Sequence, residues 1–226
     1  MIIDRLPVTF TTPSPQKIQA GLGVAGFTHR YTPNGILGAV GAIVTSWADD
    51  IGSRALAGAN GPIVRALADG RKYLEFDGVN DTIKNDTMPA GDVGTVIMIA
   101  RNRATDTGTT IMASGTGVSI NRAGTSGTML NPGTGVVNAT KLDNQWRFVA
   151  APATAAAASL TIDGVKATAT PSGIWGTNLR IGANGSPNFW SQLDIVEMVT
   201  YPTALSDADL ATIRTAMKSS YPAILL

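Results

Sequence analysis

The sequence contains no cysteine and only one histidine in 226 residues. Without thiols the chain can form no disulfide, no thiolate metal site and no cysteine nucleophile. A serine triad needs a histidine base, and the single histidine, His29, lies in a glycine-rich segment of a chain that has no Gly-x-Ser-x-Gly motif. We therefore expect His29 at a turn or on the surface, and we expect no hydrolase of the serine or cysteine class.

Charge is also scarce. Charged residues make up 15% of the chain, the net charge is +1, and the lysines and arginines are scattered. Nucleic-acid binding needs a concentrated basic face, so no nucleic-acid partner is expected. The longest mostly apolar run, residues 35–45, is too short to span a membrane, and the first residues lack the pattern of a secretory signal. We expect no membrane partner, no signal peptide, and synthesis in the host cytoplasm.

What the chain does contain is a series of short alternating or apolar runs, each followed by Gly, Asn or Asp, which is typical of strands and turns. Residues 93–100 are almost continuously apolar and predict a strand buried on both faces. Asp163-Gly164 predicts a hairpin turn. One helix is predicted over residues 207–219, where Ser206 and Asp209 form a capping-box pattern. Residues 1–40, rich in proline and glycine, predict an extended, flexible N-terminal arm.

Five phrases stand in a fixed order along the chain: residues 47–52, 76–81, 146–149, 160–164 and 195–206. In this order the chain resembles the laminin-G-like, concanavalin A-like β-sandwich family, of the type found in phage and bacterial structural proteins. The resemblance implies an all-β, two-sheet antiparallel jelly-roll sandwich over residues 41–226, with one C-terminal helix. Trp47 and Trp146 are expected to fill the space between the sheets, because aromatic side chains bury the most area per residue.

Paired acidic residues decide whether this fold could cleave a glycan, because glycanase branches place two carboxylates on one face of a strand. Asp194 and Glu197 are three residues apart, so a regular strand would put them on opposite faces. Glu75 and Asp77 do alternate, but Asp77 begins an Asp-Gly turn, and we expect both on the solvent side. We therefore predict no catalytic residues and no enzymatic activity.

Two ligand sites can be considered. A sugar site would need aromatic platforms near amides, and this pattern occurs in one late stretch of the chain: Trp175, Asn184, Asn188 and Trp190. The alternative is that Phe189-Trp190 belongs to the core. Calcium would need oxygen ligands, which gather near turns at Asp49, Asp50, Asp77, Asn80 and Asp81. Since Asn and Asp are also common turn residues, we predict no metal site and no cofactor, with calcium as the alternative.

These observations favour a non-enzymatic structural protein of a phage-like virion, either a capsid decoration or a fibre or tail component. Low charge, the N-terminal arm and an apolar C-terminus suit contacts between copies and with other virion proteins, and the major capsid protein is the expected partner. A homo-oligomer is expected, because identical subunits usually associate symmetrically. The alternative is a carbohydrate- or receptor-binding adhesion module on the same fold.

Overall fold

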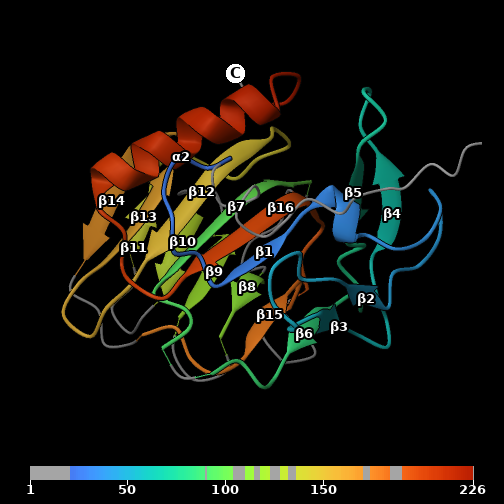
Figure 1. Ribbon diagram of the computed structural model, residues 1–226, viewed down its shortest axis with the longest axis horizontal. Coiled ribbons are helices and arrows are strands. Elements are labelled where there is room, and N and C mark those ends of the chain that lie inside the picture. The colour runs from blue at the N-terminus through green and yellow to red at the C-terminus, as the bar shows by residue number, and fades with distance from the viewer. Residues whose placement is uncertain are drawn as a thin grey trace, which may run out of the picture.

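The computed structural model describes residues 21–89, 91–103, 110–114, 118–122, 128–131, 136–169, 174–183 and 190–225. Within these ranges the chain forms two antiparallel β-sheets and one long helix, α2 (Figure 1). The predicted all-β sandwich with a C-terminal helix is confirmed. No described helix is long and apolar enough to cross a membrane.

We call the sheet that contacts α2 the inner sheet and the other the outer sheet. The inner sheet has the strand order β14-β13-β12-β7-β16-β5-β4, and β1 also pairs with β16. Its strands are β1 (His29–Tyr31), β4 (Ile63–Ala66), β5 (Lys72–Glu75), β7 (Thr95–Asn102), β12 (Arg147–Pro152), β13 (Ala158–Ile162), β14 (Val165–Ala169) and β16 (Leu193–Tyr201).

The outer sheet has the order β11-β10-β9-β8-β15-β6-β3-β2. Its strands are β2 (Ser46–Trp47), β3 (Leu56–Ala57), β6 (Ile83–Asn85), β8 (Thr110–Ala113), β9 (Ser119–Arg122), β10 (Thr128–Asn131), β11 (Val136–Asn138) and β15 (Leu179–Ile181). A short 3₁₀ helix, η1 (Pro33–Gly35), follows β1.

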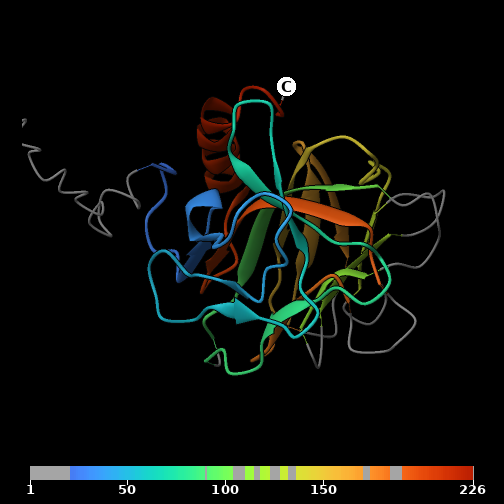
Figure 2. The same cartoon turned by 90° about the vertical axis from the view of Figure 1, so that its right-hand side faces the viewer.

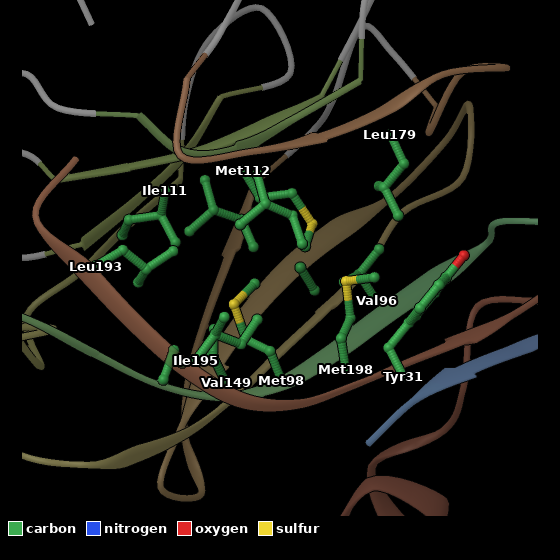
Figure 3. Packing of buried hydrophobic residues seen from close by; sticks show 14 of the residues in the cluster. Tyr31, Val96, Met98, Ile111, Met112, Val149, Leu179, Leu193, Ile195 and Met198 are labelled. Carbon is green, nitrogen blue, oxygen red and sulfur yellow. The ribbon is translucent and has the colours of Figure 1, made fainter. Parts of the chain in front are cut away.

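The main hydrophobic core lies between the two sheets. Met98 of β7 and Met198 of β16 face Met112 of β8 across this space (Figure 3). Trp47 is fully buried in the same cluster, as predicted. Trp146 is not: it packs, only partly buried, on the other face of the inner sheet. Trp146 stands just before β12, whose residues are buried on both faces of the sheet, so no alternation of polar and apolar residues shows which face Trp146 takes.

The inner sheet is buried on both faces. Alternate residues of β7 point toward the core and toward α2, so Ile97 and Ile99 pack with Leu210 and Ile213 of the helix. The helix lies along β12, β13 and β14 (Figure 1), and it stays on one side of the paired sheets in the turned view (Figure 2). This arrangement confirms the strand buried on both faces that residues 93–100 predict.

Helix α2 (Asp207–Ser220) begins and ends by local rules. The Ser206 side chain accepts a hydrogen bond from the Asp209 backbone N–H, and the Asp209 carboxylate accepts one from the Ser206 backbone, which confirms the capping box. Met217 is buried near the far end, and the Tyr221 N–H bonds the carbonyl of Met217 at the C-cap. The helix runs one residue beyond the predicted range.

The sandwich begins earlier than the sequence predicts. The sequence predicts a flexible arm over residues 1–40, yet β1 pairs with β16 in register from His29 opposite Thr200 to Tyr31 opposite Met198. Leu22 and Phe27 are also buried, against the cluster under α2. Glycine content hid a segment in which Tyr31 and Ile36 are buried as well. Residues 1–20 of the predicted arm lie outside the described residues.

Candidate functional site

A β-bulge in β16 places two buried carboxylates on one face of the inner sheet. The register between β16 and β7 shifts between Ile195 and Glu197, so one extra residue is inserted into the strand. Because of this insertion Asp194 and Glu197 both lie on the face that contacts α2. The prediction that their spacing puts them on opposite faces is wrong, since it assumes an unbroken two-residue alternation.

Asp194 lies at the end of this face and binds two arginines from β7 and the residue just after it. Its Oδ2 accepts a hydrogen bond from Arg101 Nε at 2.6 Å, and its Oδ1 accepts one from Arg103 Nε at 2.9 Å. The carboxylate is completely buried, whereas each arginine keeps about a quarter of its side chain in solvent: 25% for Arg101 and 28% for Arg103. Burial raises the pKa of Asp194, and the two guanidiniums act against that rise.

Glu75 of β5 lies directly opposite Asp194 in the sheet register. Its Oε1 accepts hydrogen bonds from Arg65 at 3.1 and 2.9 Å, and these bonds lower the pKa of Glu75. The Glu75 side chain is 21% exposed. Two neighbouring carboxyl groups therefore have pKa values shifted in opposite directions, one by burial and one by an arginine.

Two aromatic rings complete this surface. Tyr73 and Trp146 meet edge to face, with ring centroids 5.4 Å apart and planes at 85°. The Arg101 guanidinium lies over both rings, 4.8 Å from the centroid of Trp146 and 5.7 Å from that of Tyr73. Since Arg101 is also fixed by Asp194, every group in the cluster is held by another. We call it the arginine–aromatic surface: Arg65, Tyr73, Glu75, Arg101, Arg103, Trp146 and Asp194.

This surface combines a rigid, partly exposed aromatic ring with guanidinium donors and a carboxylate acceptor. Arg65, Arg101 and Arg103 outnumber Glu75 and Asp194, so the surface carries one excess positive charge. Aromatic faces with fixed hydrogen-bonding groups beside them suit polar ligands that also have an apolar side. The sequence signal for it was the pair of arginines two residues apart at the end of a buried strand.

Of the four predicted sugar-site residues, the structure describes only Trp175 and Trp190. Trp175 is buried, and its indole N–H donates to the carbonyl of Ala151 at 2.9 Å, so it is a core residue. Trp190 is half-buried and engaged with other groups. Asn184 and Asn188 lie outside the described residues.

The carboxylates considered for calcium are engaged by the chain itself. Asp77 accepts the backbone N–H groups of Val79 and Asn80, and Asp81 accepts that of Asp77. Asp50 accepts the Thr32 hydroxyl. Among the described residues, no three acidic or histidine side chains are arranged to hold a metal ion. The calcium alternative stays a prediction that no observation tests.

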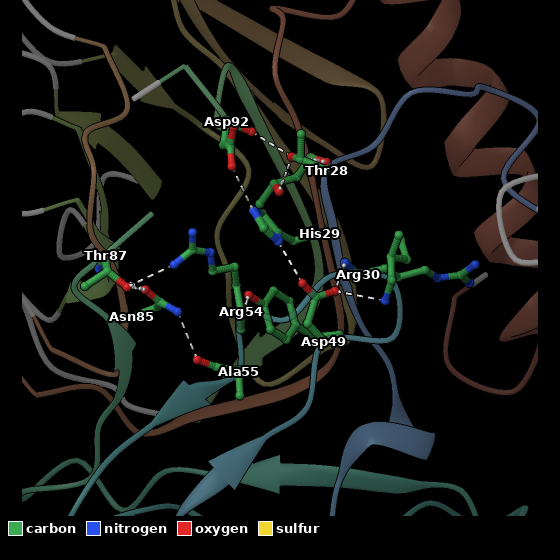
Figure 4. A network of polar contacts seen from close by, with 12 residues as sticks. Thr28, His29, Arg30, Asp49, Arg54, Ala55, Asn85, Thr87 and Asp92 are labelled. Carbon is green, nitrogen blue, oxygen red and sulfur yellow. Dashed lines mark hydrogen bonds and ion pairs between the residues drawn. The ribbon is translucent and has the colours of Figure 1, made fainter. Parts of the chain in front are cut away.

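Asp49 belongs to a second polar network, centred on His29 (Figure 4). The Nδ1 of His29 lies 2.7 Å from Asp49 Oδ2, and the Nε2 lies 3.5 Å from Asp92 Oδ2. Only 4% of His29 is exposed, so its predicted place at a turn or on the surface is wrong. Asp49 Oδ1 also accepts the N–H groups of Arg30 and Ile51. The network joins β1 to the loop after β2, which is a structural role.

Comparison with known proteins finds no matching family and no matching curated relative. Solved structures do match. Trypanosoma rangeli sialidase superposes with a TM-score of 0.67 at 14% identity, over 88% of this chain and 34% of that one. The binding domain of Paraclostridial Mosquitocidal Protein 1 matches with a TM-score of 0.59 at 13% identity, over 81% of this chain and 52% of that one. The HCR/D W1238A mutant matches with the same TM-score over 86% and 52%.

These likenesses show the concanavalin A-like β-sandwich fold. The chain spans about a third of the sialidases that it resembles and about half of the two other proteins. Because enzymes are among the structures that share this fold, the prediction that the protein is not an enzyme is contradicted. That prediction also rested on the spacing of Asp194 and Glu197, which the bulge overturns.

Proposed function

We propose that the protein is a recognition module that binds a carbohydrate-bearing receptor through the arginine–aromatic surface. The observation that carries the proposal is the fixed position of Arg101, held over Trp146 and Tyr73 and anchored on Asp194. A site whose side chains are already locked loses little conformational entropy when a ligand binds. The fold shared with a toxin binding domain and with a sialidase solved in complex with sialic acid supports the same proposal.

Binding to an immobilised glycan array tests it. Trp146→Ala removes the aromatic platform, and Arg101→Lys keeps the charge but loses the planar donor group. We expect each variant to lose at least about tenfold in apparent affinity for the glycans that the native protein binds. Arg180→Gln, a charge change on the outer sheet, is the matched control. Native-like binding by a folded Trp146→Ala variant would rule out this surface.

The same glycans can be incubated with the protein to detect turnover, because the likeness to sialidases leaves an activity open. Glu75→Gln is the informative variant. Loss of turnover together with retained binding would assign a chemical role to Glu75. Loss of both would assign it to recognition.

A second candidate function is assembly through protein–protein contacts, and one observation favours it. Leu37, Val40 and Ile43 lie in a single loop and are 66%, 58% and 65% exposed. The loop backbone is held in place, since Lys72 Nζ donates to the Gly38 carbonyl at 2.8 Å and the Gly41 N–H donates to Val64. Clustered exposed aliphatic side chains on a fixed backbone are typical of an interaction surface.

For this candidate we propose that a second copy of the chain covers the loop. The triple variant Leu37→Ser/Val40→Ser/Ile43→Ser should then be monomeric in analytical ultracentrifugation. Val79→Ser/Val165→Ser, at exposed valines elsewhere, should keep the native mass. An oligomer unaffected by the triple variant, or a monomeric native protein, would exclude self-association through the loop. The place on a virion and contact with a major capsid protein stay predictions that no observation tests.

A further inference from the structure

We infer that the protein has a second binding site, a cavity beneath α2 that takes a small carboxylate with a short apolar part. The cavity measures about 190 Å³ and lies between the first turns of α2 and the hairpin of β13 and β14. A single water needs about 10–15 Å³ by the same kind of measure, so the space exceeds one water more than tenfold. It is separate from the arginine–aromatic surface and independent of the function proposed for that surface.

Two polar groups in the cavity wall are buried without a partner among the described residues. The hydroxyl of Thr161, a residue only 7% exposed, makes no hydrogen bond to any described residue. The Nε of Arg214 is likewise buried and unbonded within the described part of the chain. A buried polar group without a hydrogen-bond partner is unfavourable, so each would gain from a ligand atom. Arg214 can only donate, and Thr161 can donate or accept.

The hairpin turn at one side of the cavity makes room for the Arg214 guanidinium. Asp163 and Gly164 both have positive φ, 50° and 90°, which confirms the predicted Asp-Gly turn. A Cβ at Gly164 would lie only 2.7 Å from Nη1 of Arg214. The bare glycine therefore gives the guanidinium its place in the wall.

The charges around the cavity favour an anion. Lys166 and Arg214 contribute two positive charges, and Asp207, which pairs with Lys166 at 2.7 Å, contributes one negative charge. The nearby Asp163 carboxylate is already paired with Arg147 at 3.0 Å. One positive charge thus remains, on Arg214, whose Nε has no partner among the described residues. A ligand carboxylate would accept hydrogen bonds from Arg214 Nε and from the Thr161 hydroxyl. Both buried groups would then have a partner.

The remaining wall is apolar, so the part of the ligand beyond its carboxylate should be apolar too. Phe148, Leu210 and Ala211 line the cavity beside the two polar groups. A ring or a short chain attached to the carboxylate would contact these side chains, and its apolar surface would then be removed from water, which favours binding. An aromatic monocarboxylate matches both parts of the wall, whereas an inorganic anion matches only one.

Titration of the ¹⁵N-labelled full chain with sodium benzoate, followed by NMR, tests the inference. We expect saturable shifts of the Arg214 Nε–H and Gly164 N–H signals. Benzamide has the same shape without the charge, and it should bind at least about tenfold more weakly, since a charge-assisted hydrogen bond is lost. Equal binding of the two probes, or no saturable shift with benzoate, would overturn the inference.

Variants locate the site. Arg214→Gln and Thr161→Val should each weaken benzoate binding by about tenfold or more. Ala211→Phe should abolish binding by filling the cavity while leaving every polar atom in place. Lys218→Gln makes the same charge change farther along α2 and should bind as the native protein does. Benzoate binding that survives both Arg214→Gln and Ala211→Phe in folded protein would contradict the assignment. Glycan binding should be unchanged in all four variants.

Discussion

The Nδ1 of His29 lies 2.7 Å from Oδ2 of Asp49, and this buried contact joins β1 to the loop after β2. Burial alone would raise the pKa of Asp49. Hydrogen bonds from His29 and from the backbone N–H groups of Arg30, Gly52 and Ile51 outweigh burial and lower it. The ionised form of Asp49 is therefore the form that stabilises the folded protein.

A pH dependence follows from this lowered pKa. The unfolded chain holds a proton on Asp49 more tightly than the folded chain, so stability from this group is present above the unfolded pKa of about 3.9. It is lost as pH falls through the folded pKa. We expect the free energy of unfolding, measured with urea between about pH 6 and pH 3, to fall more steeply in the native protein than in Asp49→Asn. Parallel curves would show that Asp49 contributes nothing to acid sensitivity.

Removing Asp194 should destabilise the fold strongly. Asp194→Ala leaves Arg101 and Arg103 without their shared carboxylate, and breaking a buried ion pair typically costs about 3–5 kcal/mol. Because both guanidiniums reach solvent, we expect the low end, about 3 kcal/mol, by chemical denaturation. Glu75→Gln is the control, and a partly exposed pair should cost no more than about 1 kcal/mol. Equal losses in the two variants would contradict the ranking.

Asn138 connects the two sheets. Its amide donates to the carbonyls of Leu160 and Val165 at 2.9 and 2.8 Å and accepts the N–H of Thr140, and only 1% of the residue is exposed. Asn138→Ala leaves the buried Leu160 carbonyl without this donor and removes two part-buried bonds, so we expect a loss of about 2 kcal/mol in unfolding experiments. Asn85→Ala removes similar bonds at the surface, where water replaces them. A loss at Asn85 as large as that at Asn138 would refute the role of burial.

The cap of α2 gives a smaller effect. Ser206→Ala removes the capping box and should lower the free energy of unfolding by about 1 kcal/mol. Ser219→Ala, near the other end of the helix, removes only a hydroxyl that bonds the Thr215 carbonyl, and it should change stability by less than about 0.5 kcal/mol. Thermal unfolding monitored by circular dichroism compares the two. No difference between them would mean that the helix start is not stabilised by its cap.

Much of the fold could be predicted because its signals are local. The apolar run of β7, the Asp163-Gly164 turn and the Ser206 cap each depend on a few adjacent residues. The site depends on relationships that no local pattern contains. Whether Asp194 and Glu197 share a face is decided by one inserted residue in β16, and the bulge leaves no mark in composition. Likewise, β1 is made a strand by its partner β16 rather than by its own sequence.

The turn at Gly164 and the arginine above it mark the chamber under α2 in the sequence. Any larger residue there would require the Arg214 head group to shift, since even a methyl group would come within 2.7 Å of its Nη1. A related chain that carries glycine at this position together with arginine at the matching helical position can keep the chamber. A chain with a larger residue at this position must turn the guanidinium aside and hold the hairpin at a φ that side chains rarely adopt.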